Sequence, residues 1–269
     1  MTPRTRISRL FDGLRQAGRR GLIGYLTAGD PTLERTPSLV AALERGGVDL
    51  IELGVPFSDP VADGPVIQRA SERALASGAT LRRILEVAAE IRRRSETPLL
   101  LFTYLNPVLR YGLEALARDA AAAGVDGLLL TDLSVEEAGQ YVEVARAHGL
   151  DTVFLAAPTS RPERLQRIAS YSRGFVYLVS RTGVTGERAS LARSAAELVR
   201  AMRRMTELPL AVGFGISRAE HVAELAPLAD AVVVGSAFVR LIGEHGASAS
   251  LEGELEALAR ELKRGFDLK

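Results

Sequence analysis

Short apolar runs alternate with longer segments of helical periodicity along most of the chain. The short runs are apolar on both faces, which is typical of parallel strands covered by helices on either side. In the longer segments apolar residues recur every three or four positions, which predicts amphipathic helices. The predicted strands are residues 22–27, 48–53, 99–103, 125–131, 151–156, 175–179, 208–213 and 229–234. The predicted helices between them are residues 32–45, 81–94, 113–123, 136–148, 162–170, 191–204 and 218–226, with further helices at 7–16 and 251–262.

Eight strands that alternate with helices through short connections predict a (β/α)₈ TIM barrel. We expect an extra N-terminal helix and extra helices after strands two and eight. The 269 residues are close to the ~250 of one such barrel, so residues 1–269 are expected to form a single domain. An open doubly wound sheet is the alternative, but it usually has fewer strands and a glycine-rich nucleotide motif after the first one. The first predicted strand leads instead to Thr27-Ala28-Gly29-Asp30-Pro31.

Composition and charge exclude several classes of protein. Hydrophobic residues make up 47% of the chain, enough for a core, and the net charge of +1 gives no sign of nucleic-acid binding. The chain has no cysteine, which excludes disulfides, thiol catalysis and cysteine metal sites. Its three histidines lie in or at the ends of predicted helices without partner ligands, so we expect no protein-bound metal. No apolar stretch of about 18 residues and no secretory signal occurs, so we expect a cytoplasmic protein without a membrane span.

Two connections are longer than the others, and both follow the carboxyl end of a predicted strand. Residues 54–79 follow strand two and contain several prolines before a helical stretch at 66–77. Residues 181–190 follow strand six and contain Gly183 and Gly186. Barrel enzymes keep their active sites at the carboxyl ends of the strands, and long loops there are usually lids or binding loops. We therefore expect the functional site on this face.

Glu52 is a carboxyl near the end of a strand that is otherwise expected to be buried. An unpaired buried carboxyl is costly and its pKa rises, which suits a general acid–base near neutral pH. The alternative is a structural glutamate paired with a lysine or arginine inside the barrel. Asp63 follows in the next loop, where aspartate before glycine is more often a turn residue than a catalytic one. Asp30 and Asp59, both before proline, fit that turn role well.

Glycine-containing segments follow strands six, seven and eight, at 183–186, 213–217 and 235–237. In barrels, the loops after the last two strands and a nearby helix N-terminus commonly bind phosphate, because glycine lets backbone N–H groups approach the anion. The three segments together predict a phosphate site, with a helix that begins near Ser236. Tyr177 lies within strand six, where core packing with a satisfied hydroxyl is the ordinary role.

Several stretches spread along the chain resemble sequences of the tryptophan synthase alpha chain family, and they follow one another in the same order as in that family. The longest are YLTAGDP at 25–31, ELGVPFSDPVADGP at 52–65 and GFGIS at 213–217. Shorter ones are IQRA at 67–70, NP at 106–107, APT at 157–159 and GVTG at 183–186. The agreement runs from about residue 7 to residue 242. The chain departs from the family pattern at Gly24, Leu105 and Ser134, none of which is an acid–base position.

The resemblance implies cleavage of indole-3-glycerol phosphate to indole and D-glyceraldehyde 3-phosphate, a carbon–carbon lyase reaction of tryptophan biosynthesis. The family's catalytic glutamate and aspartate correspond to Glu52 and Asp63. Its substrate-contacting tyrosine corresponds to Tyr177, and the threonine of its mobile loop corresponds to Thr185. The backbone that binds phosphate corresponds to Gly186, Gly215, Gly235 and Ser236. The family implies no cofactor in this chain and pyridoxal phosphate in a partner beta chain, with which it forms an alpha2beta2 heterotetramer.

The resemblance also puts the beta-chain contact on the loop that contains Pro56, Phe57 and Pro60. The alternative for Phe57 is that it packs onto the barrel rim and that no partner exists. Three other functions stay open at this point: another phosphosugar enzyme such as an isomerase or decarboxylase, a non-catalytic activator of a beta chain, and a free-standing lyase. Glu52 and Asp63 together argue against the first two.

Overall fold

The computed structural model describes residues 4–179, 188–213 and 215–268, without the side chains of residues 188–194. All strand pairs in it are parallel, in the order β5-β4-β3-β2-β1-β9-β8-β7-β6. The strands are β1 Gly21–Thr27, β2 Leu50–Gly54, β3 Leu99–Thr103, β4 Gly127–Leu130, β5 Asp151–Thr152, β6 Leu155–Ala156, β7 Val176–Val179, β8 Leu210–Gly213 and β9 Ala231–Val234.

The two outermost members of this order, β5 and β6, are successive pieces of one predicted strand, residues 151–156. Between them, the Val153 N–H donates to the Leu128 carbonyl at 3.0 Å, and the Tyr177 N–H donates to the Phe154 carbonyl at 3.1 Å. The connecting residues therefore continue the pairing on both sides, and the sheet closes on itself. This closure confirms the predicted (β/α)₈ barrel and excludes the open sheet.

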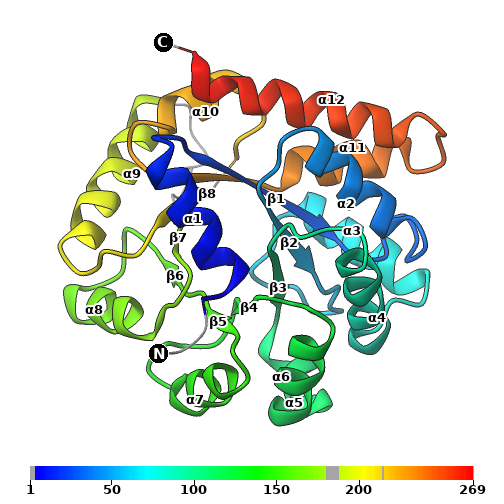
Figure 1. The fold of residues 1–269 in the computed structure, drawn as a ribbon, viewed down its shortest axis with the longest axis horizontal. Coiled ribbons are helices and arrows are strands. Elements are labelled where there is room, and N and C mark those ends of the chain that lie inside the picture. The colour runs from blue at the N-terminus through cyan, green and yellow to red at the C-terminus, as the bar shows by residue number, and fades with distance from the viewer. Residues whose placement is uncertain (1–3, 180–187, 214, 269) are drawn as a thin grey trace.

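The helices form a ring around the barrel (Figure 1). The N-terminal helix α1 Arg6–Gln16, the helix α3 Pro65–Ala76 after β2, and the helix α11 Ser236–His245 after β9 confirm the three expected additions. A further short helix, α5 Leu105–Tyr111, was not predicted from the sequence. The remaining helices are α2 Thr36–Arg45, α4 Leu81–Arg92, α6 Leu113–Ala122, α7 Gly139–Ala147, α8 Pro162–Tyr171, α9 Arg188–Arg203, α10 Ala219–Leu225 and α12 Leu251–Arg264, and a 3₁₀ turn covers Gly265–Asp267.

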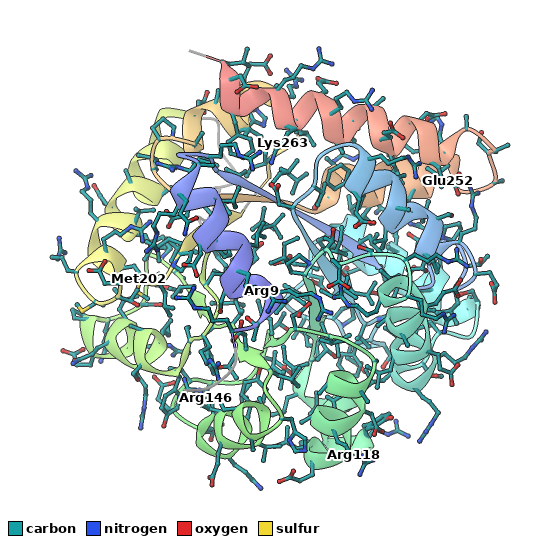
Figure 2. The ribbon with its side chains drawn as sticks, in the orientation of Figure 1. Arg9, Arg118, Arg146, Met202, Glu252 and Lys263 are labelled. Carbon is teal, nitrogen blue, oxygen red and sulfur yellow. The ribbon has the colours of Figure 1, made fainter. Side chains whose placement is uncertain are left out.

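Helix α1 lies across one end of the barrel, the end that faces the viewer in Figure 1. Its buried residues Ile7, Phe11 and Leu14 pack against the inward-facing side chains of the strands. The rings of Phe11 and Phe175 are 5.7 Å apart between centroids. Figure 2 shows Arg9 of α1 over the middle of this end, whereas Arg118 of α6 lies at the outer edge of the ring. Helix α1 thus covers the amino end of the barrel, and a site is expected at the carboxyl end.

Candidate active site

A cavity of about 300 Å³ opens at the carboxyl ends of the barrel strands. It brings together six of the eight predicted site residues, which come from four strands and the loops that follow them. The other two, Thr185 and Gly186, lie outside the described residues. The cavity is lined by Tyr25, Glu52, Ala62, Asp63, Gly64, Ile67, Phe102, Thr131, Leu155, Tyr177, Val179, Gly215, Ile216, Val233, Gly235 and Ser236.

Glu52 is the third residue of β2, and only 1% of its surface is exposed. Its Oε1 has no hydrogen-bond partner among the described residues. Burial raises the pKa of Glu52 from 4.5 to about 8, and no described cation opposes this shift. The carboxyl is therefore protonated at neutral pH. The alternative of a structural glutamate paired with lysine or arginine is contradicted, because no described lysine or arginine pairs with Glu52.

Two tyrosines lie beside Glu52, and two glycines make room for them. A Cβ atom on Gly54 would overlap the phenol of Tyr25, and one on Gly213 would overlap the phenol of Tyr177. Burial is the main cause that raises the pKa of both hydroxyls, so both stay protonated. Tyr177 thus lines the cavity, as the resemblance implies, instead of serving only as core packing.

Asp63 is more than a turn residue in this structure. It is half-buried, and its Oδ2 accepts a hydrogen bond of 2.9 Å from the hydroxyl of Tyr104. Burial raises the pKa of Asp63, and the hydrogen bond from Tyr104 lowers it again in part. The side-chain amide of Gln68 donates to the Asp63 carbonyl at 2.9 Å. Tyr104 thus holds the carboxyl of Asp63 at the cavity wall, and Gln68 holds its backbone.

Asp30 lies at a turn as expected, where its N–H donates to the Thr27 carbonyl at 3.2 Å, but its carboxylate has a further role, whereas Asp59 is exposed on its loop. Asp30 is 1% exposed and accepts two hydrogen bonds of 2.8 Å from the guanidinium of Arg73. This bidentate pair joins the end of β1 to α3, so Asp30 supports the loop that carries the cavity residues. The pairing of Asp30 with Arg73 was not visible in the sequence, because Arg73 lies 43 residues away on a helix.

Gly215, Gly235 and Ser236, which follow β8 and β9, form a further part of the cavity wall. Gly235 is the N-cap of α11, whose first turn carries no acidic residue. Gly215 has φ +63°, a conformation that favours glycine. The first N–H groups of a helix lack acceptors within it, and the helix dipole attracts an anion there. This arrangement can accept a phosphate group, although its occupancy by one stays a prediction.

The sequence alone missed several residues of the cavity. Tyr25 and Phe102 pack edge to face, with ring centroids 5.3 Å apart, and Leu155 and Thr131 also line the cavity. The first three are strand residues of types that ordinarily fill a core, and Thr131 directly follows β4, so only a position near a strand end could have singled them out. Among the described residues, no group of histidines and carboxylates could hold a metal ion. No helix in that part of the chain is both long and apolar enough to span a bilayer.

Comparison with known proteins gives a consistent result. The family model of the tryptophan synthase alpha chain matches residues 11–266. The tryptophan synthase alpha chain of Solibacter usitatus is 68% identical over 262 residues, which cover 97% of this chain and 98% of that protein. That of Halorhodospira halophila is 49% identical over 264 residues, with 98% and 97% covered.

Solved structures agree with the sequence comparisons. The crystal structure of tryptophan synthase subunit alpha from Legionella pneumophila has a TM-score of 0.91 at 36% identity, covering 98% of this chain and 99% of that one. A crystal structure of tryptophan synthase from M. tuberculosis has a TM-score of 0.89 at 40% identity, covering 99% of this chain and 100% of that one. The matches extend over the strands and loops that form the cavity. The chain therefore belongs to the tryptophan synthase alpha chain family.

Proposed function

We propose that the cavity binds indole-3-glycerol phosphate and that Glu52 and Asp63 carry out its cleavage to indole and D-glyceraldehyde 3-phosphate. Membership of the family makes the chain a lyase of tryptophan biosynthesis. The observation that supports the two residue roles is Glu52, a buried carboxyl without a partner, whose pKa of about 8 keeps it protonated at neutral pH. A protonated acid at the wall of an apolar cavity is what the first step needs.

The reaction begins with proton transfer from the Glu52 carboxyl to C3 of the indole ring, which forms an indolenine cation. Asp63 accepts a hydrogen bond from the indole N–H, where positive charge develops. The Glu52 carboxylate then takes the proton of the side-chain hydroxyl next to the ring. The carbon–carbon bond breaks, its electrons return to the indole ring, and the hydroxyl carbon becomes an aldehyde. Glu52 is protonated again at the end, and no cofactor in this chain takes part.

The phosphate group occupies the other end of the cavity in this proposal. The N–H groups near Gly215, Gly235 and Ser236 hold it, together with Gly186 from outside the described residues. Tyr177 and Thr185 contact the rest of the substrate. Phosphate binding at a distance from the reacting carbon supplies energy that orients that carbon against Glu52.

We propose further that the chain works in the cytoplasm in an alpha2beta2 heterotetramer with a tryptophan synthase beta chain, which carries pyridoxal phosphate. Family membership supports a beta-chain partner. The solved structure from M. tuberculosis is named a tryptophan synthase as a whole.

Indole release from indole-3-glycerol phosphate tests the proposal directly. We expect indole and glyceraldehyde 3-phosphate in equal amounts from the wild-type chain, and neither from a Glu52→Gln variant. A chain that converts another phosphosugar and releases no indole would be an isomerase or decarboxylase. A chain with no turnover that still stimulates a beta chain would be a non-catalytic activator.

A further inference from the structure

Tyr104, the residue after β3, holds two successive residues of the loop that follows β2. Only 2% of its surface is exposed. Its hydroxyl donates to Oδ2 of Asp63 at 2.9 Å and accepts from the N–H of Ala62 at 3.0 Å. Its ring also packs on that of Phe57, with centroids 5.2 Å apart. One buried side chain therefore contacts both ends of the loop from Phe57 to Asp63.

The contacts of Asp63 leave part of its carboxyl for a ligand. Among the described residues, Tyr104 is the one hydrogen-bond donor to this carboxyl, and it reaches Oδ2. Oδ1 is then open to an N–H from a molecule in the cavity. Since the phenol is fixed by its own contacts with Ala62 and Phe57, it also fixes the direction in which the carboxyl points.

We infer that Tyr104 is a positioning residue, which holds Asp63 in the orientation needed to accept the indole N–H. The inference rests on the proposed function, and it assigns a role to a residue that neither the sequence motifs nor the proposed mechanism uses. Tyr104 does not line the cavity itself, so it acts through Asp63 and not by touching the substrate.

The same hydrogen bond also lowers the pKa of Asp63. The titratable groups around Asp63 are Tyr25 of β1, Glu52 of β2 and Tyr104 after β3, and no described cation contributes to its pKa. Burial raises the pKa of Asp63, and the bond from Tyr104 is what lowers it. Burial and the neighbouring Asp63 raise the pKa of Tyr104, so the phenol keeps its proton and remains a donor. Loss of the hydroxyl leaves burial unopposed, so the pKa of Asp63 rises further.

Tyr104→Phe tests this role, because it removes the hydroxyl and keeps the ring that packs on Phe57. We expect kcat to fall by about tenfold or more while KM changes less than about threefold, since Asp63 acts on charge formed during the reaction. The acid limb of the kcat–pH profile should move to higher pH. The matched control is Tyr111→Phe, since Tyr111 donates to Asp119 at 2.8 Å and neither residue lines the cavity. This control should leave both constants and the profile unchanged.

A double-mutant cycle tests whether Tyr104 acts through Asp63. In an Asp63→Asn background, the added Tyr104→Phe change should cost less than about twofold in kcat, because the group that it positions is already gone. Equal losses in the two backgrounds would overturn the inference.

A second measurement does not depend on activity. In protein labelled with ¹³C at aspartate carboxyls, the Asp63 resonance is assigned by its loss in Asp63→Asn and then titrated. We expect its pKa to be higher in Tyr104→Phe than in wild type and unchanged in Tyr111→Phe. An unchanged Asp63 pKa in Tyr104→Phe would overturn the positioning role even in a working lyase. A raised pKa in a chain that releases no indole would instead overturn the proposed function and leave the contact between the two residues standing.

Discussion

The free-energy cost of burying Glu52 depends on pH. In the folded chain its pKa is raised from 4.5 to about 8, so the folded state keeps a proton that the unfolded state releases. The stability that this proton contributes is fully present below pH 4.5 and is lost as pH rises through the folded pKa. Between pH 4.5 and about 8, each pH unit removes about 1.4 kcal/mol from the free energy of unfolding. The same property that suits Glu52 to acid–base work therefore weakens the fold at alkaline pH.

Glu52→Gln should lose activity and gain stability at the same time. The amide keeps the size of the side chain but transfers no proton, so we expect kcat to fall by at least about 10³-fold with substrate binding retained. Urea unfolding at pH 8 should show a higher midpoint than in wild type, and this advantage should shrink toward pH 5.

The wild-type rate should also fall as pH rises through about 8, where Glu52 loses its proton. A Glu52→Gln variant that kept more than about a tenth of wild-type turnover would exclude Glu52 as the acid–base, since the loss would be below about 1.4 kcal/mol. A stability gain without loss of turnover would mean that the buried carboxyl has no part in the reaction.

Asp63→Asn should lower kcat and kcat/KM together, because the carboxylate is assigned to a charge that forms only during the reaction. Loss of one preorganised electrostatic contact typically costs about 10²–10³ in kcat. Steady-state kinetics on indole-3-glycerol phosphate measures both constants. A raised KM with unchanged kcat would make Asp63 a residue of substrate binding instead.

Helix α11 offers a way to separate phosphate binding from the stability of the fold. Ser236 is its first residue, and an acidic side chain in the first turn stabilises a helix by about 0.3–1 kcal/mol. The same negative charge repels a phosphate bound at that N-terminus. For Ser236→Asp we therefore expect KM for the phosphorylated substrate to rise by about tenfold or more, with no loss of melting temperature.

Ser236→Asn is the control for that experiment, because it has the same size as aspartate without the charge. It should raise KM much less than Ser236→Asp does. Equal effects of the two variants would mean that bulk, and not charge, causes the change. An unchanged KM in Ser236→Asp would place the phosphate elsewhere in the cavity.

The helices and strands were largely predictable because each one repeats a simple pattern. Apolar runs bounded by polar loops gave all eight barrel strands, and only the division of residues 151–156 into β5 and β6 was not visible. Helix α5 was missed because it is short and contains Pro107, which usually ends a helical pattern. Proline is tolerated in the first turn, where its missing N–H would have no acceptor in any case.

The site was predictable only where one residue was unusual by itself. Glu52 stood out as a carboxyl in a buried strand, and the glycines stood out at strand ends. Tyr104 did not, because its role depends on Asp63, which lies 41 residues earlier in the chain. A sequence pattern records spacing along the chain and carries no record of such contacts. Pairs of this kind become visible only when the fold brings two loops together.

Helix α1 covers the amino end of the barrel, whereas the cavity opens at the carboxyl end. There, the loop after β2 connects the cavity with the outside of the molecule. Asp63 of this loop lines the cavity, whereas Val61 is 85% exposed. Pro56 is buried, and Phe57 is half-buried because its ring packs on that of Tyr104. Val61 is the large exposed apolar side chain of the loop, and a partner that covers it would contact the segment that carries Asp63.

Titration with a tryptophan synthase beta chain tests this coupling. We expect the two chains to associate and indole release to rise, because a partner that binds the ordered loop increases the population in which Asp63 is in place. By linkage, a substrate analogue in the cavity should tighten the complex by the same factor by which the beta chain tightens the analogue. Calorimetry of each association, with and without the other ligand, measures both factors.

A matched pair of variants locates the contact. Val61→Asp should weaken the association by about tenfold or more and leave the activity of the isolated chain unchanged, because a charge at an apolar contact is costly when it is desolvated. Leu268→Asp, at an exposed leucine near the C-terminus, should change neither the association nor the activity. Weakening by both variants, or by neither, would place the partner on another surface. Full activity of the isolated chain with no association would make the protein a free-standing lyase, whose loop needs no partner to hold Asp63 in place.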